Sequence, residues 1–277
     1  MRIGKRVRLS IRLVVVTIVG LILAFPLIYL VLGSLMTAAQ LTSYPPQFIP
    51  AGLHLENYVA AWAFIQPRSA INSVIFTVAT VGLQWTLCIS GGFVLAKMRF
   101  RASNPILALL GMSLFVPAVT TLVPTFIVTD EFHLVNTYPG LILPIVAQTG
   151  FGTLLFRQFI VSLPDDLISA ARVDGAGWFV VLTRIVVPLA NPMTGAYLAI
   201  SVLTAWNMYL WPLVVATTPS VQVLTETLAP LASSNYGGTI SENVAFAATV
   251  ITTLPMVIAF LVAQRSFVAG LSGSGVE

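Results

Sequence analysis

Residues 13–35 read LVVVTIVGLILAFPLIYLVLGSL, a stretch without a single Asp, Glu, Lys, Arg or His. A helix needs about 20 apolar residues to cross the roughly 30 Å hydrocarbon core of a bilayer, so this stretch is long enough to span a membrane. Strands of a membrane barrel would show runs of about ten residues with alternating polarity, and this stretch does not alternate. It therefore predicts a transmembrane helix.

Five further uncharged stretches follow along the chain, at residues 70–95, 106–128, 140–156, 193–216 and 244–263. The stretch 140–156 is short, and we expect its helix to continue through Arg157 and Gln158. The sequence thus predicts an all-α integral membrane protein with six transmembrane helices. Prolines within these stretches are expected to kink the helices, namely Pro26, Pro117, Pro124, Pro144 and Pro255.

The composition supports a membrane protein. Hydrophobic residues make up 57% of the 277 residues and charged residues only 8%, whereas soluble domains have roughly 25% charged residues. Residues 1–277 are therefore interpreted as a single transmembrane domain whose apolar side chains face lipid. One Cys and two His exclude a disulfide scaffold, a Cys-rich zinc module and a clustered His site.

The first stretch has an alternative interpretation as a secretory signal, because five basic residues precede it. The apolar part of a signal is about 7–15 residues long, and residues 13–35 exceed that length. Thr37-Ala38-Ala39 loosely resembles a cleavage site, which keeps the signal open as the alternative. An uncleaved first helix agrees better with the length.

The distribution of basic residues predicts the orientation in the membrane. Basic residues near the ends of transmembrane helices mark the cytoplasmic side. If the N-terminus is cytoplasmic, only Arg68 of the thirteen Lys and Arg residues lies outside, and the outer segments contain Glu56, Asp130, Glu131, Glu226 and Glu242. Both termini of this multi-pass protein of the cell membrane are thus expected to be cytoplasmic. The net charge of +4 then reflects topology and not binding of nucleic acid.

The six stretches lack the ionisable groups that proton-coupled transporters need at membrane depth. Sodium could still bind backbone carbonyls at broken helices. No G-x-x-x-x-G-K-[ST] or H-E-x-x-H sequence occurs, so neither a phosphate-binding loop nor that zinc motif is present. We expect no catalytic residues and no metal site, and a membrane enzyme is disfavoured because no nucleophile is paired with a base.

Residues 157–192, between the fourth and fifth stretches, form a long inner segment. Pro164, Asp165 and Asp166 suit the first turn of a helix, and Gly175 and Gly177 would end it. A second short helix is expected from Trp178 to Pro188. The first helix has a small, mildly apolar face that suits a groove on another protein, made of Leu167, Ala170, Ala171 and Asp174. The alternative is a helix on the membrane surface, which would need bulkier side chains and more lysine.

This segment resembles the cytoplasmic EAA loop of the permease subunits of ABC importers. The corresponding residues are Ser169, Ala170, Ala171, Arg172, Val173, Asp174, Gly175 and Ala176, followed by IVVP at residues 185–188. The pattern is typical of the carbohydrate-uptake branch, which includes maltose and glycerol-3-phosphate permeases. The resemblance covers nearly the whole chain: LFRQF at 155–159 and WNMYLWP at 206–212 look most like glycerol-3-phosphate permeases, and QRSFVAGL at 264–271 also fits.

Two residues depart from the family pattern. The usual glutamate, implicated in contact with the ATPase subunit, is Ser169 here, and the usual leucine before the proline is Val187. Serine can form hydrogen bonds but no ion pair, so this contact must differ. The resemblance nevertheless implies that an ATPase is coupled through the loop, by Asp165, Asp166, Ser169, Ala170, Ala171, Arg172, Asp174 and Gly175.

The resemblance also implies partners. They are a homologous second permease, two ATP-binding cassette subunits and an extracytoplasmic solute-binding protein. ATP and Mg would bind in the ATPase subunits, and this chain would bind no cofactor itself.

Polar and aromatic residues in the predicted helices are candidates for the solute path. Rings combined with amides suit a sugar or polyol, and the candidates are Trp206, Asn207, Tyr209, Trp211, Gln84 and Gln148. The alternatives are an aromatic belt at the membrane interface for the rings and hydrogen bonds between helices for the amides, to which Asn72 also belongs. The prediction is a permease subunit of an ATP-driven importer for a sugar, sugar phosphate or related polyol. The alternative is a stand-alone secondary carrier or channel for a small polar solute.

Overall fold

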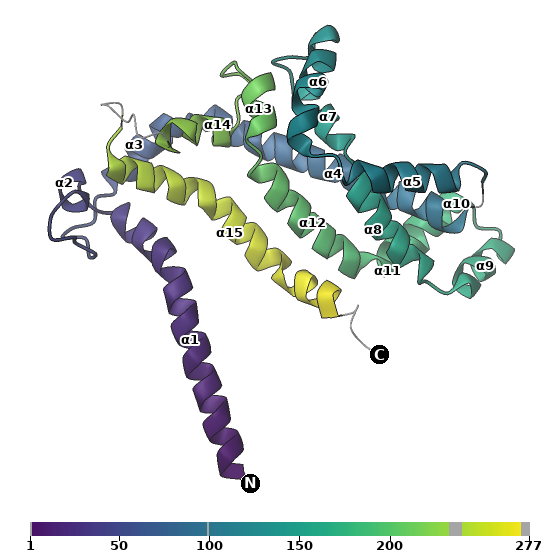
Figure 1. The fold of residues 1–277 in the computed structure, drawn as a ribbon, viewed down its shortest axis with the longest axis horizontal. Coiled ribbons are helices and arrows are strands. Elements are labelled where there is room, and N and C mark those ends of the chain that lie inside the picture. The colour runs from purple at the N-terminus through teal and green to yellow at the C-terminus, as the bar shows by residue number, and fades with distance from the viewer. Residues whose placement is uncertain (1, 99, 233–239, 273–277) are drawn as a thin grey trace. The chain divides into compact units, whose positions relative to one another are not determined.

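The computed structural model describes residues 2–98, 100–232 and 240–272, and all regular elements in these ranges are helical (Figure 1). In chain order they are α1 Arg2–Gly33, α2 Ala38–Leu41, α3 Glu56–Ile65, α4 Pro67–Lys97, α5 Ser103–Ser113, α6 Ala118–Glu131, α7 Tyr138–Val146, α8 Gly150–Val161, α9 Asp165–Val173, α10 Trp178–Val181, a π-helical turn Leu182–Val186, α11 Val187–Leu189, α12 Asn191–Trp206, α13 Leu210–Val215, α14 Leu224–Leu228, a 3-10 turn Ala229–Ala232 and α15 Glu242–Ser272.

The helices form two compact units. The first unit combines Met1–Gln66 with Leu228–Leu254, and the second combines Pro67–Thr227 with Pro255–Glu277. The candidate functional residues singled out in the sequence all lie in the second unit.

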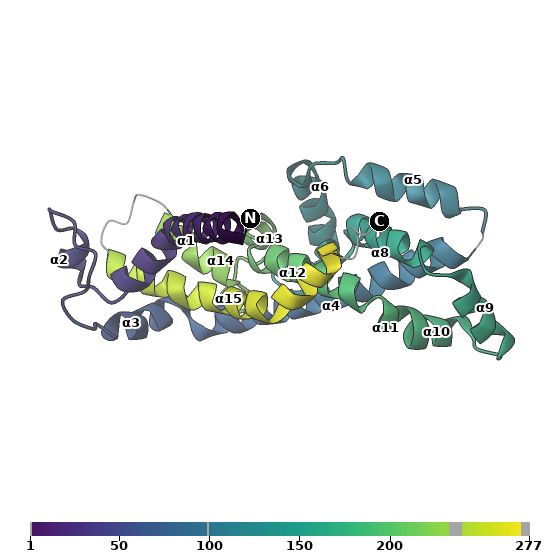
Figure 2. The ribbon, with the colours of Figure 1, turned by 90° about the horizontal axis from the view of Figure 1, so that it is seen from below.

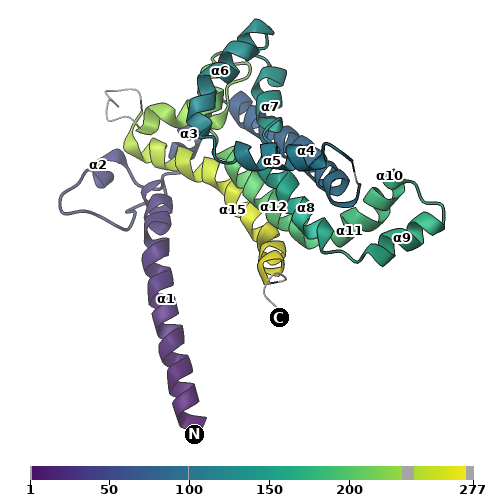
Figure 3. The ribbon, with the colours of Figure 1, turned by 45° about the vertical axis from the view of Figure 1, so that its right-hand side comes forward.

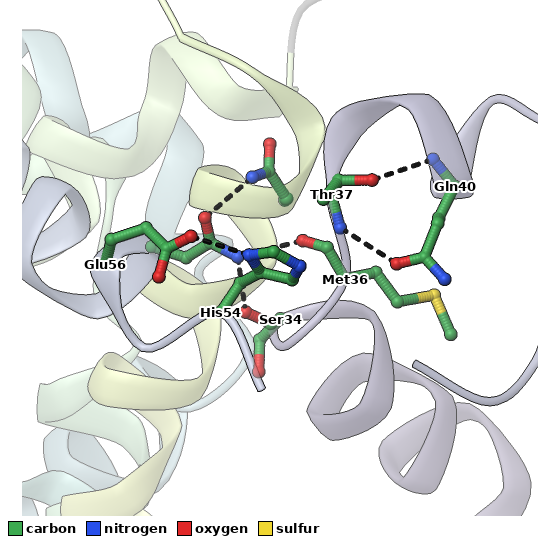
Figure 4. A network of polar contacts seen from close by, with 8 residues as sticks. Ser34, Met36, Thr37, Gln40, His54 and Glu56 are labelled. Atoms are coloured by element: carbon green, nitrogen blue, oxygen red, sulfur yellow. Dashed lines mark hydrogen bonds and ion pairs between the residues drawn. The ribbon is translucent and has the colours of Figure 1, made fainter. Parts of the chain in front are cut away.

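In the first unit, a buried amide joins three segments. The side-chain Nδ2 atom of Asn57 donates to the backbone oxygens of Ser34 and Met36, at 2.9 Å each. Its Oδ1 atom accepts from Nδ2 of Asn243 at 2.7 Å. Because Asn57 is 4% exposed, these bonds satisfy an amide that would be costly to bury alone. They connect the end of α1 with α3 and with the start of α15 (Figure 4).

The second unit is built around α4, which packs along α8, α12 and α7. Gly92 permits the close approach of α4 and α8, because a Cβ atom there would lie 2.8 Å from the backbone nitrogen of Arg157. One buried cluster, including Phe76, Leu141 and Trp211, surrounds the first half of α4. A second cluster, including Phe93 and Phe156, surrounds its last turns.

Three helices are individually long and apolar enough to cross a membrane: the α1 segment Arg12–Gly33, α4, and the α15 segment Glu242–Leu261. Three further crossings arise only if each of three bent helix pairs counts as one span. The all-helical fold class is therefore confirmed for the described residues, and the number six stays a prediction.

In the middle of the chain the predicted stretches are broken more sharply than the expected kinks. Residues 106–128 divide into α5 and α6, which meet at 108° (Figure 2), and residues 140–156 divide into α7 and α8, which meet at 46°. Pro117 explains the first break, because proline disfavours helical conformation in the residue before it and here directly precedes α6. The other four prolines lie inside α1, α6, α7 and α15.

The stretch 193–216 is also interrupted. Helix α12 ends at Trp206, and α13 begins at Leu210. On its other side, α12 meets the helical segment Trp178–Leu189 at 78°, and these two form the third bent pair. The short helix expected at 178–188 is thus present, continuous through a π-helical turn.

Candidate functional site

The predicted partner-binding helix is present as α9, at the edge of the second unit beside α10 (Figure 3). Asp165 and Asp166 occupy its first turn, after Pro164, where negative charge interacts favourably with the helix dipole. Nζ of Lys97, the last residue of α4, lies 2.6 Å from Oδ1 of Asp165 and donates to the backbone oxygen of Leu163 at 3.0 Å. The ammonium group thus joins the end of α4 to the start of α9.

The C-terminal end of α9 closes on Gly175, which has φ +85°. The N–H of Gly175 donates to the carbonyl of Arg172, and the N–H of Ala176 donates to the carbonyl of Ala171. This pair of bonds is the Schellman arrangement, which requires a left-handed residue where glycine stands. The helix end therefore has the conformation that the sequence predicted.

Arg172 turns back onto its own loop. Its Nη1 atom donates to the carbonyl oxygen of Ala176 at 2.8 Å, and its guanidinium lies 4.6 Å from the ring centre of Trp178. The Trp178 ring in turn contacts Phe93 of α4 edge-on, with ring centres 6.0 Å apart. Arg172 thus braces the turn between α9 and α10.

The two faces of α9 have different environments. Ile168 is buried and Ala171 is half-buried, because both pack on the second cluster of the core. Leu167, Ala170 and Asp174 are exposed on the other side, as are Asp166 and Ser169. Of the face expected to meet a partner, Ala171 is therefore turned partly toward the core, and the rest is exposed.

Several of the solute-path candidates line one cavity of about 390 Å³. Asn207, Tyr209 and Trp211 enter it from the interruption between α12 and α13, and Gln148 enters from the break between α7 and α8. The Trp211 indole is 4% exposed and donates to the backbone oxygen of Leu141 at 3.0 Å, which fixes its ring as a wall of the cavity. Residues of α6 complete the lining.

A smaller cavity of about 160 Å³ adjoins the first, and Gln148 and Thr204 line both. Gln84 of α4 also lines the smaller cavity. Its Nε2 atom donates to the backbone oxygen of Ile145 at 2.6 Å and to that of Gln148 at 3.4 Å. The cavities therefore lie where α4 meets the break between α7 and α8 and the interruption between α12 and α13. The candidates brought together around them are Gln84, Gln148, Asn207, Tyr209 and Trp211.

Trp206 and Asn72 lie elsewhere. Trp206 lines a separate apolar groove with Val78, Val202 and neighbouring residues. Asn72 accepts a hydrogen bond from the hydroxyl of Tyr138 at 2.6 Å and donates to the backbone oxygens of Ser220 and Gln222. Hydrogen bonding between segments, the alternative considered for the amides, therefore describes Asn72.

Sequence reasoning missed three residues. Lys97 was counted only as a cytoplasmic charge. Thr204 and Thr80 line the smaller cavity, but a threonine in an apolar stretch gives no signal of its own. Only the spacing of Thr204 and Asn207, three residues apart on one helix face, could have indicated a shared location. Among the described residues, no three His, Cys, Asp or Glu side chains come together to hold a metal ion.

Comparison with known proteins identifies a family. The family described as "Binding-protein-dependent transport system inner membrane component" matches residues 88–273. The chain is 31% identical to the arabinooligosaccharides transport system permease protein AraQ of Bacillus subtilis (strain 168), over 93% of this chain and 92% of that protein. It is also 31% identical to the sn-glycerol-3-phosphate transport system permease protein UgpE of Yersinia pestis, over 94% of this chain and 95% of that protein.

Solved structures share the fold. One is a chain of a bacterial ABC transporter involved in the import of the acidic polysaccharide alginate, with a TM-score of 0.81, 21% identity, and coverage of 95% of this chain and 98% of that chain. Another is a chain of the bacterial alginate ABC transporter in complex with an alginate pentasaccharide-bound periplasmic protein, with a TM-score of 0.65 and 17% identity over 94% of each chain. At these identities the likeness concerns the fold.

Proposed function

The chain belongs to the family of inner membrane components of binding-protein-dependent transport systems, and we propose that it forms half of the solute path of an ATP-driven importer for a sugar, sugar phosphate or related polyol. It is a membrane-embedded permease subunit and not an enzyme. The partners we propose are a homologous second permease, two ATP-binding cassette subunits that bind ATP and Mg, and an extracytoplasmic binding protein. Both termini are proposed to be cytoplasmic, and residues 157–192 are proposed to form the coupling loop.

The observation that supports this function best is the reach of α4. Thr80 and Gln84 in its middle line the smaller cavity, and Lys97 at its end contacts Asp165 of α9. One helix therefore touches both the proposed solute path and the proposed ATPase-binding helix. Movement of α9 by an ATPase would be transmitted to the cavity wall through this direct connection.

The exposed residues of α9 are suited to docking. Leu167, Ala170 and Asp174 form a small apolar face that ends in one carboxylate, and Ser169 lies beside it. A short amphipathic helix of this kind fits a groove on a partner protein. We propose that this face, together with Asp166, contacts the ATPase subunit, while Arg172 and Gly175 hold the loop in shape.

The solute class is proposed from the relatives and the cavity together. The relatives are named for arabinooligosaccharides and for sn-glycerol 3-phosphate, which share hydroxyl-bearing carbon chains. Aromatic walls and amides, here Trp211, Tyr209, Asn207 and Gln148, suit such solutes because rings pack on carbon faces while amides bind hydroxyls.

The test is reconstitution of the importer in vesicles with and without its ATPase subunits. We expect solute uptake that requires ATP, and a crosslink between Cys introduced at Ala170 and the ATPase. The control is Cys introduced at Ser220, an exposed residue after α13 and outside residues 157–192, which should give no such crosslink. Uptake at full rate without any nucleotide-binding partner would show a secondary carrier or channel instead.

A further inference from the structure

The adjoining cavities offer no counter-charge to an ion. None of the described side chains that line either cavity is Asp, Glu, Lys, Arg or His. An anion that leaves water for such a site would find no cation among these side chains to replace its hydration, and burying an unpaired charge is unfavourable. The lining therefore favours a neutral solute on electrostatic grounds.

The hydrogen bonds inside the lining add a second constraint. Gln84 donates through Nε2 to the backbone oxygen of Ile145 at 2.6 Å, Asn207 donates through Nδ2 to that of Leu203 at 2.8 Å, and Thr204 donates through Oγ1 to that of Ile200 at 2.9 Å. Because a carbonyl oxygen can only accept, these partners fix which end of each amide points toward the backbone. The oxygens of these three side chains are therefore available to the cavities as acceptors.

Two further side chains line the cavities with unused hydrogen-bonding capacity. Thr80 is fully buried, and its Oγ1 atom has no partner in the part of the chain that the structure describes. The Gln148 side chain is exposed and reaches both cavities. An unsatisfied buried hydroxyl is unfavourable, so Thr80 gains when a solute hydroxyl or water binds it.

We propose that the two cavities form one site for an uncharged solute rich in hydroxyl groups, held by Thr80, Gln84 and Gln148 beside Thr204, and that this site discriminates against phosphate- and carboxylate-bearing solutes. A hydroxyl can donate to the acceptor oxygens of Gln84 and Asn207, whereas phosphate and carboxylate oxygens only accept. The inference rests on the proposed function and narrows its solute class from sugars, sugar phosphates and polyols to the neutral ones.

The test measures protection of a cysteine in the assembled importer. Thr204→Cys is placed in a Cys88→Ser background, and the rate of its reaction with a small maleimide is followed. Neutral probes are glycerol, arabinotriose and maltotriose, and anionic probes are glycerol 3-phosphate and a galacturonate trisaccharide. We expect at least one neutral probe to slow labelling several-fold and the anionic probes to leave the rate unchanged.

The matched control is Thr183→Cys in the same background. Like Thr204, Thr183 is exposed and donates through Oγ1 to the carbonyl four residues earlier, at 2.8 Å, but it lines neither cavity. No probe should protect it. Protection of Thr204→Cys by an anionic probe as strong as by the neutral ones, or protection by no neutral probe, would overturn the inference.

Two substitutions at Gln148 test the charge argument itself. Gln148→Lys supplies the missing cation and should make glycerol 3-phosphate protect Thr204→Cys, while Gln148→Met, similar in length but unable to bind a hydroxyl, should weaken protection by neutral probes. Unchanged selectivity in the lysine variant would contradict the inference. The labelling needs no ATP, so loss of ATP-dependent uptake with neutral protection retained would reject the proposed coupling and leave this site standing.

Discussion

Gly175 shows how one residue sets the geometry of α9. Its φ of +85° lies where residues with a Cβ atom are strained, and only its backbone demands glycine, since a Cβ atom there would meet nothing within 4 Å. Substitution would thus act through conformation and not through a clash. The closing turn between α9 and α10 depends on this conformation, because two backbone hydrogen bonds form around it.

We expect Gly175→Val to insert in the membrane normally but to separate ATP hydrolysis from solute uptake. Holding a β-branched residue in the left-handed region costs about 1–2 kcal/mol. This cost is enough to change the conformation of the turn after α9 and therefore the direction of α9 relative to α10. The measurement is the ratio of uptake to ATPase activity in reconstituted importer. The control is Gly177→Val, because Gly177 has φ −70° and open space around it. Equal coupling in the two variants would contradict the prediction.

Glu226 is the residue at which stability should depend on pH. It lies in α14, outside the candidate membrane spans, and is 7% exposed. Its Oε1 atom has no partner within the described residues. Burial raises the pKa of this carboxyl from 4.5 to about 7, and hydrogen bonds from the Val223 backbone and the Gln222 side chain offset the rise only in part.

Because the folded state holds a proton that the unfolded state has lost between pH 4.5 and about 7, stability should fall as pH rises through this window. The loss is at most about 3 kcal/mol, from 1.36 kcal/mol per pKa unit. Glu226→Gln should make the thermal unfolding midpoint nearly independent of pH between pH 5 and 8. Glu56→Gln is the control, since Glu56 is exposed. The pKa of its carboxyl is lowered, first by a backbone hydrogen bond and second by the hydrogen bond with the His54 side chain. A wild-type midpoint that rises over this window would oppose the assignment.

Among the elements, α4 connects the two candidate sites, and the Lys97 ammonium group makes a polar contact between α4 and α9. The Lys97 side chain is 8% exposed while the Asp165 side chain is 84% exposed. Because the Asp165 carboxylate is open to water, this ion pair contributes at most about 1 kcal/mol. The pair therefore matters for where α9 lies relative to α4 and little for whether the protein folds.

Lys97→Met should consequently lower uptake several-fold while the thermal midpoint changes little. The methionine keeps the apolar length of the side chain but cannot donate to Leu163 or Asp165. Lys97→Arg, which keeps the charge and can still donate, should retain most of the uptake. Combining Lys97→Met with Asp165→Asn should add little further loss if the two residues act through one contact, and fully additive losses would argue against a shared role.

The interruptions between helices are the elements that sequence periodicity did not reveal. A hydrophobicity pattern records that residues 140–156 and 193–216 are apolar, but apolar residues are compatible with one helix or two. At Ala147–Thr149 and Asn207–Tyr209 the chain leaves the helix, and these points supply Gln148, Asn207 and Tyr209 to the cavity. In an apolar environment, broken helices are tolerated where the freed backbone groups line a cavity or contact protein.

At the scale of the whole molecule, the distribution of basic residues predicts the orientation in the membrane. The prediction of cytoplasmic termini rests on thirteen basic residues, of which Arg99 lies outside the described residues, and the side chains of Arg2, Lys5, Arg6, Arg8 and Arg265 are not described either. A test of the orientation is therefore a measurement of which side of the membrane each exposed segment faces.

Cysteine labelling in a Cys88→Ser background provides it. Because basic residues surround α9 and only Arg68 is assigned outside, Ala170→Cys should react with a membrane-impermeant maleimide only after the cell membrane is opened. Ser220→Cys, on an exposed loop after α13, should react in intact spheroplasts. Both positions are exposed, so each serves as the accessibility control for the other. The opposite pattern would reverse the assigned orientation.

The sequence by itself determined that this is a helical membrane protein, where the helix Asp165–Val173 begins and ends, and which family the chain resembles. These properties depend on local information: uncharged stretches long enough to span lipid, Asp165 and Asp166 at a helix start, and Gly175 at a helix end. Only the tertiary structure decided that the Trp206 side chain lines a different cavity from Asn207 and Trp211. It also decided that Lys97 contacts Asp165 of α9 and that Thr80 and Thr204 line a cavity. These facts depend on where helices break and which faces then meet, and contacts between residues as distant as Lys97 and Asp165 leave no periodic trace in the chain.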